Sequence, residues 1–409
     1  METKENNLTV FGKEIIDEKA ILQLENCLIE DSIGVLTADA HYGYSMPVGG
    51  CVAYKNHISP SGVGFDIACG NYAVRTDIKS IDINIKKVMD EIMQRISFGV
   101  GRPNNEPVDH PLFDKIDKAE FEPQRKLLQL AKTQLGTIGS GNHFVDIFED
   151  ENGFVWVGVH FGSRGFGHKT ASGFLALAQG KEFDGKVSEG SMDSKPTLFD
   201  INSQLGQDYI NAMHLAGEYA YAGRETAVNK VLEILGAKKT FEVHNHHNFA
   251  WLEEHFGEKY WVVRKGCTPA MPGQLGFIGA NMMDMSVIIE GVDSELSKKG
   301  LYSTVHGAGR ILSRTQAAGK QKWMKGEDGR KRPVRIEKGL IDFDVVKNDM
   351  KEHKIELRGA GPDEAPGVYK NLEEVLSYQG ETIKVLHRLK PIGVAMAGEN
   401  EREEDPYKD

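Results

Sequence analysis

Residues 59–70 read SPSGVGFDIACG and place the carboxylate of Asp66 three positions before the thiol of Cys69, within a stretch rich in glycine. A carboxylate and a thiolate at this spacing can converge on one metal site if the backbone turns between them. In the alternative, purely structural interpretation, Cys69 is a small buried hydrophobic residue and Asp66 caps a turn. The surrounding sequence has to decide between these two interpretations.

Five histidines lie in similar glycine- or asparagine-rich turns: His41, His143, His160, His247 and His306. Such turns place a side chain at the end of a strand, facing a cavity, with backbone N–H groups free to receive anions. One histidine of this kind is more often a structural hydrogen bonder than a ligand, but several of them beside Asp66 and Cys69 indicate a divalent-metal centre. Thiolate and imidazole ligands suggest zinc, whereas the carboxylate favours a harder ion, so ligand type alone leaves the ion open.

Two of these turns also carry an arginine. They read GSRG at residues 162–165 and GAGR at residues 307–310, so that Arg164 and Arg310 each follow a histidine closely. Arginine can bind phosphate through two parallel hydrogen bonds, and glycine lets backbone amides approach the same group. Each segment alone is compatible with an ordinary tight turn. The pair, next to a metal centre, favours phosphoryl-transfer chemistry.

Short helical and strand patterns alternate along the chain without a regular strand–helix–strand rhythm. Apolar spacing predicts helices at residues 82–97, 199–236 (as one helix or two) and 372–389. Strand-like runs occur at residues 155–160, 240–243, 260–263 and 285–289. This irregular interleaving predicts an α+β fold rather than a doubly wound parallel sheet. Without an internal repeat or a linker, we expect one large domain over residues 1–409.

The composition argues against several classes of protein. A net charge of −11 disfavours broad, non-specific nucleic-acid binding, and the lysine- and arginine-rich residues 320–338 are either a local basic groove or, as their composition favours, a solvated loop or hairpin. Four cysteines without framework spacing, a polar N-terminus and no apolar run of the ~18 residues that a bilayer span needs predict a cytoplasmic protein with no membrane association. We expect the acidic tail at residues 399–409 to be disordered.

Eight motifs follow one another along the chain: ADAHYGYSMPVGG (38–50), SPSGVGFDIACG (59–70), GTIGSGNHF (136–144), VHFGSRGFGH (159–168), NHHN (245–248), RKG (264–266), HGAGRILSR (306–314) and VYK (368–370). In this combination the sequence resembles the RtcB family of RNA-splicing ligases, which join RNA ends using GTP and manganese. The resemblance covers almost the whole chain, and the ordered set is far more specific than any one motif. It implies a single RtcB-like domain with a central mixed or antiparallel β core surrounded by helices.

The resemblance assigns roles residue by residue. Asp66, Cys69, His143, His160 and His247 match the ligands of two manganese ions, which the cysteine bridges in this family. His306 matches the histidine that becomes covalently guanylylated, and Arg164 matches a catalytic, phosphate-binding arginine. The other implied nucleotide-binding residues are Asp39 (with its neighbour His41), Asn142, Asp146, Ser286, Gly307, Ala308, Gly309, Arg310 and the guanine-pocket residue Tyr369.

The resemblance also implies a reaction in three steps. Neutral His306 attacks the α-phosphate of GTP, GMP passes to an RNA 3′-phosphate, and the 5′-hydroxyl of a second RNA then displaces GMP. A 2′,3′-cyclic phosphate end is first hydrolysed at the same site, and Arg164 and the metal ions stabilise charge on the transferring group. RNA repair or tRNA splicing are the implied roles. We expect a monomer or weak dimer, with an accessory activating protein as a candidate partner.

Three departures from the family pattern surround the nucleotide pocket. The family's glutamate is Asp146 here, its Pro-Gly-Ser-Met-Gly segment is replaced by GANMM at residues 279–283, and the lysine expected to contact guanine O6 is Met396. Loss of that charged donor should weaken base discrimination by about 1–3 kcal/mol. The ligands and His306 are unchanged, so we predict retained metal chemistry with altered nucleotide use, as in a divergent paralogue.

Two other functions stay open. A metal-dependent 2′,3′-cyclic phosphodiesterase, or another phosphoesterase with altered or no nucleotide use, would explain the departures around the pocket. A non-catalytic RNA-binding paralogue is the third interpretation. His306 and the complete set of five ligands argue against it, because a binding module needs no nucleophile.

Overall fold

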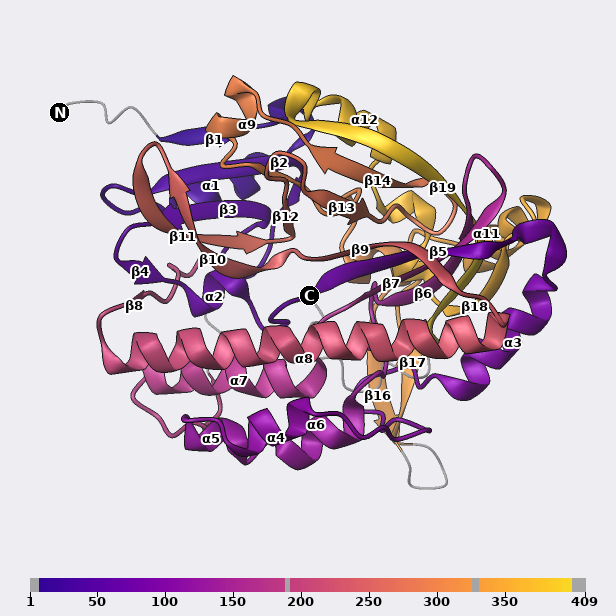
Figure 1. Cartoon of the computed structure of the whole chain (residues 1–409), viewed down its shortest axis with the longest axis horizontal. Coiled ribbons are helices and arrows are strands. Elements are labelled where there is room, and N and C mark those ends of the chain that lie inside the picture. The colour runs from indigo at the N-terminus through magenta and orange to yellow at the C-terminus, as the bar shows by residue number, and fades with distance from the viewer. Residues whose placement is uncertain (1–6, 188–191, 326–330, 399–409) are drawn as a thin grey trace.

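Two β-sheets form the centre of the molecule in this computed structural model, which describes residues 7–187, 192–325 and 331–398 (Figure 1). The five-stranded sheet has the order β1 (Leu8–Val10), β2 (Ile33–His41), β3 (Val48–Tyr54), β11 (Glu258–Lys265) and β10 (Asn248–His255). The eight-stranded sheet has the order β13 (Leu275–Ile278), β14 (Ser286–Gly291), β19 (Ile383–Gly398), β6 (Phe144–Glu149), β7 (Phe154–Phe161), β5 (Gly70–Lys79) and β9 (Lys239–His246), with β18 (Glu356–Ala360) beside β19. The predicted tail at 399–409 lies outside the described residues.

Most strand pairs in these sheets are antiparallel. The two exceptions among the pairs of the described ranges are β1 with β2 and β18 with β19, which run parallel. Three smaller two-stranded pairs complete the strands: β12 (Cys267–Pro269) with β15 (Ser303–Val305), β4 (His57–Ile58) with β8 (Phe199–Asp200), and β16 (Gln321–Lys325) with β17 (Lys331–Arg335). The predicted α+β class with a mixed β core and surrounding helices is confirmed.

The register of the large sheet decides where the functional residues lie. Gly70, the first residue of β5, pairs with Phe161 at the end of β7 on one side and with His246 at the end of β9 on the other. On the far side of β7, Phe144 at the start of β6 pairs with His160. The turns that enter or leave the neighbouring strands β6, β7, β5 and β9 therefore meet at one edge of the sheet, where these strands end.

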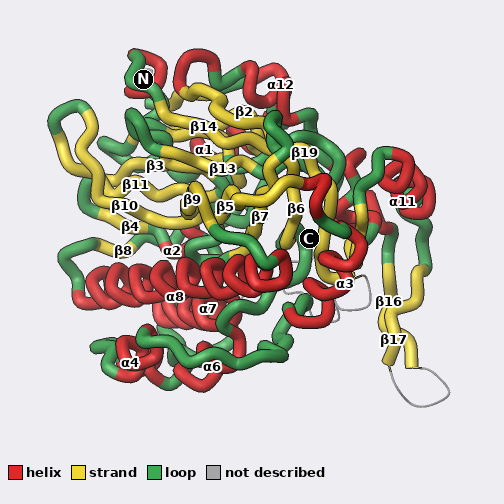
Figure 2. Tube along the Cα trace, turned by 45° about the vertical axis from the view of Figure 1, so that its right-hand side comes forward, coloured by secondary structure: helices red, strands yellow, loops and turns green. Residues whose placement is uncertain are grey.

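A layer of helices packs beneath this edge (Figures 1 and 2). It contains α7 (Arg164–Ala178) and the long α8 (Gln204–Leu235), with α4 (Leu112–Asp117), α5 (Glu122–Arg125) and α6 (Leu128–Gln134) on their outer side. The hydroxyl of Ser203 caps the first turn of α8 by accepting from the Gly206 amide at 3.0 Å, and Gly236 ends the helix with φ 63°. No helix within the described ranges is both long and apolar enough to cross a bilayer.

The remaining helices lie around the two sheets. They are α1 (Glu18–Glu25), α2 (Pro60–Val63), α3 (Ile85–Arg95), α9 (Glu295–Lys299), α10 (Arg314–Ala318), α11 (Phe343–Glu352) and α12 (Leu372–Ser377). The predicted helix at 82–97 is confirmed as α3. The predicted helix at 199–236 is the single α8 from Gln204 onwards, but its start is wrong, because Phe199 and Asp200 pair with β4 as strand β8. The four predicted strands are confirmed as β7, β9, β11 and β14.

The helix predicted at residues 372–389 is wrong in its second half. Helix α12 ends at Ser377, and β19 begins at Ile383 and pairs with β14 from Ile383 to Leu389. Residues 383–389 can satisfy a helical apolar period, but the open edge of β14 offers them a ladder of backbone hydrogen bonds. Tertiary pairing therefore overrides the local pattern.

The basic segment at 320–338 contains the antiparallel pair β16 and β17, so the hairpin interpretation is confirmed for its described residues. This hairpin projects from the body of the molecule in both views (Figures 1 and 2). At its base, Lys320 pairs with Glu337 at 3.0 Å.

Candidate metal and nucleotide site

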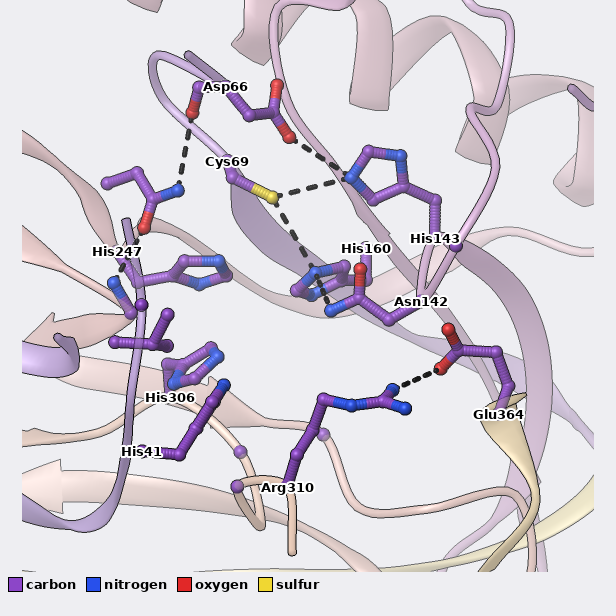
Figure 3. A pocket seen from close by; sticks show the side chains of 18 of the residues that line it. His41, Asp66, Cys69, Asn142, His143, His160, His247, His306, Arg310 and Glu364 are labelled. Atoms are coloured by element: carbon purple, nitrogen blue, oxygen red, sulfur yellow. Dashed lines mark hydrogen bonds and ion pairs between the residues drawn. The ribbon is translucent and has the colours of Figure 1, made fainter. Parts of the chain in front are cut away.

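A cavity of about 620 Å³ opens at the edge of the large sheet where the four strand ends meet (Figure 3). Most of the residues predicted for the site line it: Asp66, Cys69, Asn142, His143, Asp146, His160, His247, His306, Gly307, Ala308, Gly309, Arg310 and Tyr369. Asp39, Arg164 and Ser286 are not among the lining residues and lie behind its walls. The structure thus gathers segments from residue 39 to residue 396 around one space.

Two groups of metal-ligating side chains share the sulfur of Cys69. One group is Asp66, Cys69 and His143, the other is Cys69, His160 and His247, and within each group the ligand atoms lie within 4.8 Å of one another. The Sγ of Cys69 is 3.6 Å from the Nε2 of His143 and 3.6 Å from the Nε2 of His160. Two adjacent ligand sets with one common thiolate have the arrangement of a two-metal centre.

A strained turn brings Asp66 and Cys69 together. Ala68 has φ 59°, a left-handed conformation that is unfavourable for a residue with a Cβ, and its amide donates to the carbonyl of Asn248 at 2.7 Å. The Cys69 amide donates to the Asp66 carbonyl at 3.1 Å, which closes the turn. A Cβ at Gly162 would lie 2.1 Å from the Asp66 carboxylate, so only glycine leaves room for that ligand.

The orientation of His160 is fixed from behind by Asn71. The Nδ2 of Asn71 donates to the carbonyl of Phe277 at 2.7 Å, so its Oδ1 faces the Nδ1 of His160, 2.6 Å away. Since this oxygen only accepts, Nδ1 of His160 carries the proton and the lone pair of Nε2 points into the cavity. Burial also lowers the pKa of His160 well below its ordinary value, which keeps the ring neutral and able to bind a metal.

The pKa values of the other proposed ligands are also shifted by their surroundings. Burial lowers the pKa of His247 well below its usual value. Burial would raise the pKa of the Asp66 carboxyl, but the hydrogen bond and charge of His143 and the charge of Arg164 bring it to about 2. Burial raises the pKa of the Cys69 thiol well above normal, and a divalent cation deprotonates such a thiol on binding.

The contacts of His143 show which of its nitrogens faces the ligand set. Its Nε2 lies 3.6 Å from the Sγ of Cys69 and 3.1 Å from the Oδ2 of Asp66. Its Nδ1 points away from this group and, like the Nδ1 of His247, has no hydrogen-bond partner among the described residues. The donor set fits a pair of divalent cations, with Asp66 and three imidazoles to balance the soft sulfur.

His306 lies opposite the second ligand group, with its ring centre 4.8 Å from that of His247. Its Nδ1 is 2.7 Å from the Oδ2 of Asp39, which also accepts from the His306 amide at 3.0 Å. Burial would raise the pKa of Asp39, but hydrogen bonds from His306 and Thr37 outweigh it and hold the pKa below its ordinary value. The ionised carboxylate therefore holds the proton on Nδ1 and leaves Nε2 with a free lone pair.

The glycine-rich turn after His306 is shaped to fit Asp39. Gly309 has φ 77°, and a Cβ there would lie 1.9 Å from the Asp39 carbonyl oxygen. Next to it, His41 lines the cavity, and burial, followed by the charge of His306, lowers its pKa to about 3. His41 is therefore a neutral ring that lines the cavity beside His306.

The wall that contains Asp146 is apolar. Asp146 is 6% exposed, and its Oδ1 has no hydrogen-bond partner among the residues that the structure describes. Burial raises the pKa of its carboxyl well above the usual value, with a hydrogen bond to the Ala395 backbone opposing the shift. Phe144, Val394 and Met396 line the same part of the cavity. Met396, at the position where the resemblance leads us to expect a lysine, thus lines the cavity beside a carboxyl that has one unpaired oxygen among the described residues.

Arg310 is held by neighbouring residues rather than extended into the open cavity. Its Nη1 donates to the Tyr369 hydroxyl at 3.2 Å and lies 3.5 Å from Glu364, and its Nη2 donates to the carbonyl of Asp363 at 2.7 Å (Figure 3). Glu364 also pairs with Arg314. A phosphate that binds Arg310 has to compete with the Glu364 carboxylate.

The remaining predicted residues have supporting positions. Arg164 begins α7 with φ 52° and packs with His143 against the bare Cα of Gly139, where a Cβ would lie 2.5 Å from its guanidinium. Ser286 accepts from the Ala280 amide at 3.0 Å and so supports the replaced segment at 279–283 from below. Neither contact tests the catalytic or nucleotide-binding role predicted for them.

Two residues of the site were not found by sequence reasoning. Asn71 directly follows the SPSGVGFDIACG motif, and the alternation of side chains along a strand could have placed it across from His160. Glu364 ends the short 3-10 helix Pro362–Glu364, and no feature of the sequence distinguishes it from other acidic residues. Only the fold brings it to the cavity wall.

Comparison with known proteins identifies the family of the chain. The sequence model of the family described as tRNA-splicing ligase RtcB matches residues 28–120 and 112–397. The chain is 29% identical to the RNA-splicing ligase RtcB of Escherichia coli (strain K12) over 385 residues, 87% of each chain. It is 28% identical to the tRNA-splicing ligase RtcB of Archaeoglobus fulgidus, over 93% of this chain and 92% of that one, and 30% identical to the RNA-splicing ligase RtcB homolog 1 of Entamoeba dispar, over 87% and 77%. This chain is a member of the RtcB family of RNA ligases.

Proposed function

We propose that this protein joins an RNA end bearing a 3′-phosphate, or a 2′,3′-cyclic phosphate, to a 5′-hydroxyl end, with GTP as the activating nucleotide. The observation that carries the proposal is the position of His306. A histidine with its Nδ1 proton held by Asp39 shares one cavity with two metal-ligand groups that have Cys69 in common. This is the combination that nucleotidyl transfer through a histidine requires.

In the proposed first step, Nε2 of His306 forms a bond to the α-phosphorus of GTP, and the bond to pyrophosphate breaks. An oxygen of the RNA 3′-phosphate then attacks this phosphorus, which releases Nε2 and leaves GMP on the RNA end. In the last step the 5′-hydroxyl attacks the RNA phosphorus and GMP departs. Asp39 holds the imidazole in one tautomer throughout and stabilises the positive charge that develops on the ring.

Manganese is the proposed metal, and Asp66, Cys69, His143, His160 and His247 would hold it as a pair. When bound, it would supply positive charge that offsets the charge on the transferred phosphate and on the leaving group. The protein's own contribution is to keep His160 and His247 neutral and to fix the ligand nitrogens. The proposed accessory protein and the oligomeric state rest on the family resemblance alone.

The direct test is ligation of two RNA oligonucleotides, one with a 3′-phosphate and one with a 5′-hydroxyl. We expect a joined product only when GTP and Mn²⁺ are both present, and none from a donor with a 3′-hydroxyl. Joining without any nucleotide would contradict the proposed mechanism.

An Asp39→Asn variant should slow formation of the histidine adduct by about three to four orders of magnitude, the loss that a carboxylate-to-amide change causes in other Asp–His pairs. The amide oxygen or nitrogen would face Nδ1 without a charge, and the proton could move to Nε2, where it blocks attack. Single-turnover labelling with α-labelled GTP measures this rate. Thr37→Ser, which keeps the hydroxyl that donates to Asp39, should label at the wild-type rate. Equal rates for Asp39→Asn and the wild type would refute the role of Asp39.

The apolar wall around Asp146 bears on which base the activating nucleotide carries. A carboxyl in an apolar wall can read a purine edge as an acceptor when ionised and as a donor when protonated. Without the lysine, no charged side chain adjoins Asp146 to contact guanine O6 among the residues that line this part of the cavity. We therefore propose weakened discrimination between GTP and ATP.

A Met396→Lys variant should raise the preference for GTP over ATP by about 10- to 100-fold, corresponding to ~1.5–3 kcal/mol for a charge-assisted hydrogen bond. Competition between the two nucleotides in adduct formation measures the preference, and Met396→Leu, which keeps an apolar side chain, should leave it unchanged. If the wild type already excludes ATP as strictly as Met396→Lys does, another residue reads the base.

The same wall supports one alternative, a metal-dependent phosphoesterase that opens 2′,3′-cyclic ends without a nucleotide. Its distinguishing result is release of a 3′- or 2′-phosphate end at full rate with Mn²⁺ alone, with no adduct on His306 in the presence of GTP or ATP.

A further inference from the structure

Helix α8 carries an arginine in its middle that is fully buried and faces the metal ligands from behind. Arg224 has 0% exposure, and the large sheet covers its guanidinium. The bare Cα atoms of Gly223 and Gly217, where a Cβ would lie 3.4 Å from Phe161 and 2.9 Å from Phe249, let α8 approach both sheets closely. A buried charged group is costly unless its donors are satisfied, so its contacts show what it is there to hold.

The contacts of Arg224 end beside three of the five proposed ligands. Its Nη1 donates to the carbonyl of Ala68 at 2.9 Å and to the carbonyl of Phe161 at 2.7 Å. Ala68 directly precedes Cys69, and Phe161 directly follows His160. One nitrogen thus ties together the strained turn before β5 and the end of β7.

The rest of the guanidinium reaches β9. Nη2 lies 2.9 Å from the Nδ1 of His246, the residue before His247, and Nε donates to the Nε2 of His244 at 2.8 Å. Arginine can only donate, so both imidazole nitrogens are acceptors. Burial, then the charge of Arg224, lowers the pKa of both histidines, in agreement with neutral rings.

We propose that Arg224 is the positioning residue of the metal centre: a single planar donor that binds the backbone of the segments carrying Cys69 and His160 and two histidine side chains of the segment carrying His247. Each segment enters or leaves a different strand, and only β5 pairs with both of the others. The guanidinium adds a second connection between these segments at the point where the strands end and their backbone hydrogen bonds stop. The ligands are then held in place before any metal arrives, which lowers the cost of binding.

The planar fork is essential to this role. Four donor contacts in one plane cannot be reproduced by an ammonium group on a flexible stem. An Arg224→Lys variant keeps the charge and most of the volume but loses this geometry. By comparison, removing a group that orients metal ligands typically costs about 10- to 100-fold in metal affinity.

The chain offers a matched control in Arg264, which is equally buried on β11. Its guanidinium binds the Glu253 carboxylate at 2.6 and 2.9 Å, the hydroxyl of Ser303 and the carbonyl of Leu301, none of which adjoins a ligand. Arg264→Lys therefore reports the general effect of replacing a buried arginine. Any loss of metal binding specific to Arg224→Lys reports positioning.

Mn²⁺ binding by calorimetry, without RNA or nucleotide, tests the inference, which rests on the metal centre of the proposed function. We expect Arg224→Lys to weaken binding by about 10- to 100-fold, and Arg264→Lys to bind as the wild type does even if its melting temperature falls. Cadmium supplies a spectroscopic readout, because the thiolate-to-metal absorption of Cys69 should require more Cd²⁺ to saturate in Arg224→Lys. Wild-type affinity in that variant would overturn the inference alone, and absence of Mn²⁺ binding by the wild type would overturn the metal centre with it.

A second pair of variants keeps the test decisive if Arg224→Lys does not fold. His246→Asn retains an acceptor near the position of Nδ1, whereas His246→Leu removes it. We expect His246→Leu to bind Mn²⁺ more weakly than the wild type and His246→Asn to restore much of the loss. Equal affinity in both variants and the wild type would contradict the proposed connection to β9.

Discussion

A His306→Ala variant should form no covalent nucleotide adduct and should lose ligation by more than about 1,000-fold, because no other group replaces an activated nucleophile. Incubation with α-labelled GTP and Mn²⁺ measures the adduct directly. A phosphorus–nitrogen bond to histidine should give a protein label that is labile in acid and stable in alkali. The wild type should carry it.

The same variant should still complete the last step of the reaction. In that step the 5′-hydroxyl attacks an RNA end that already bears GMP, and His306 is no longer bonded to phosphorus. RNA activated beforehand with GMP should therefore be joined by His306→Ala at a substantial rate. His214→Ala, which changes an exposed histidine of α8 whose ring packs on Phe249, serves as the control and should label normally. Full labelling of His306→Ala would place the nucleophile elsewhere.

The second large effect is expected from Cys69→Ala, which removes the one atom common to both ligand groups. Loss of a residue that only orients a metal ligand already costs about 10- to 100-fold in metal affinity. Loss of a ligand shared by both groups should therefore lower the affinity by more than ~100-fold at both sites. Equilibrium dialysis with Mn²⁺ should show no tight binding, and adduct formation should fail with it.

Variants that change only one of the two ligand groups provide the comparison with Cys69→Ala. His143→Ala changes only the group with Asp66, and His247→Ala changes only the group with His160, so each should retain one of two bound ions. Cys51→Ala removes another buried cysteine, in β3 of the smaller sheet, and should bind Mn²⁺ normally. Two tightly bound ions in Cys69→Ala would show that the sulfur does not join the sites.

The gathering of the candidate ligands at one cavity could be predicted because each lies in a glycine- or asparagine-rich turn, but His41 and His306 lie in such turns too, and only the family resemblance separates the proposed ligands from them. Turns of this composition end strands, and strand ends of one sheet meet at an edge. His143, His160 and His247 all follow this rule. The long helix at 199–236 could be predicted for a different reason, since an apolar period sustained over many residues has few alternatives.

The parts that escaped prediction depend on pairing between distant segments. Asn71 orients His160 only through the register of β5 and β7, and Glu364 restrains Arg310 only because a segment far along the chain returns to the cavity. The segment at 383–389 became a strand because β14 was available. In a single sequence, Arg224 looks like any polar residue on the outer face of a helix.

The common sulfur of the two ligand groups also has a consequence for the supply of metal. Affinities of such sites rise from manganese towards copper and stay high for zinc, and a thiolate strengthens that bias. With one carboxylate, one thiolate and three imidazoles as ligands, the protein has little means of rejecting zinc by affinity. The ion in the cavity is then decided by which metals are free when the chain folds, so recovery of an active enzyme should depend on the growth medium as much as on the sequence.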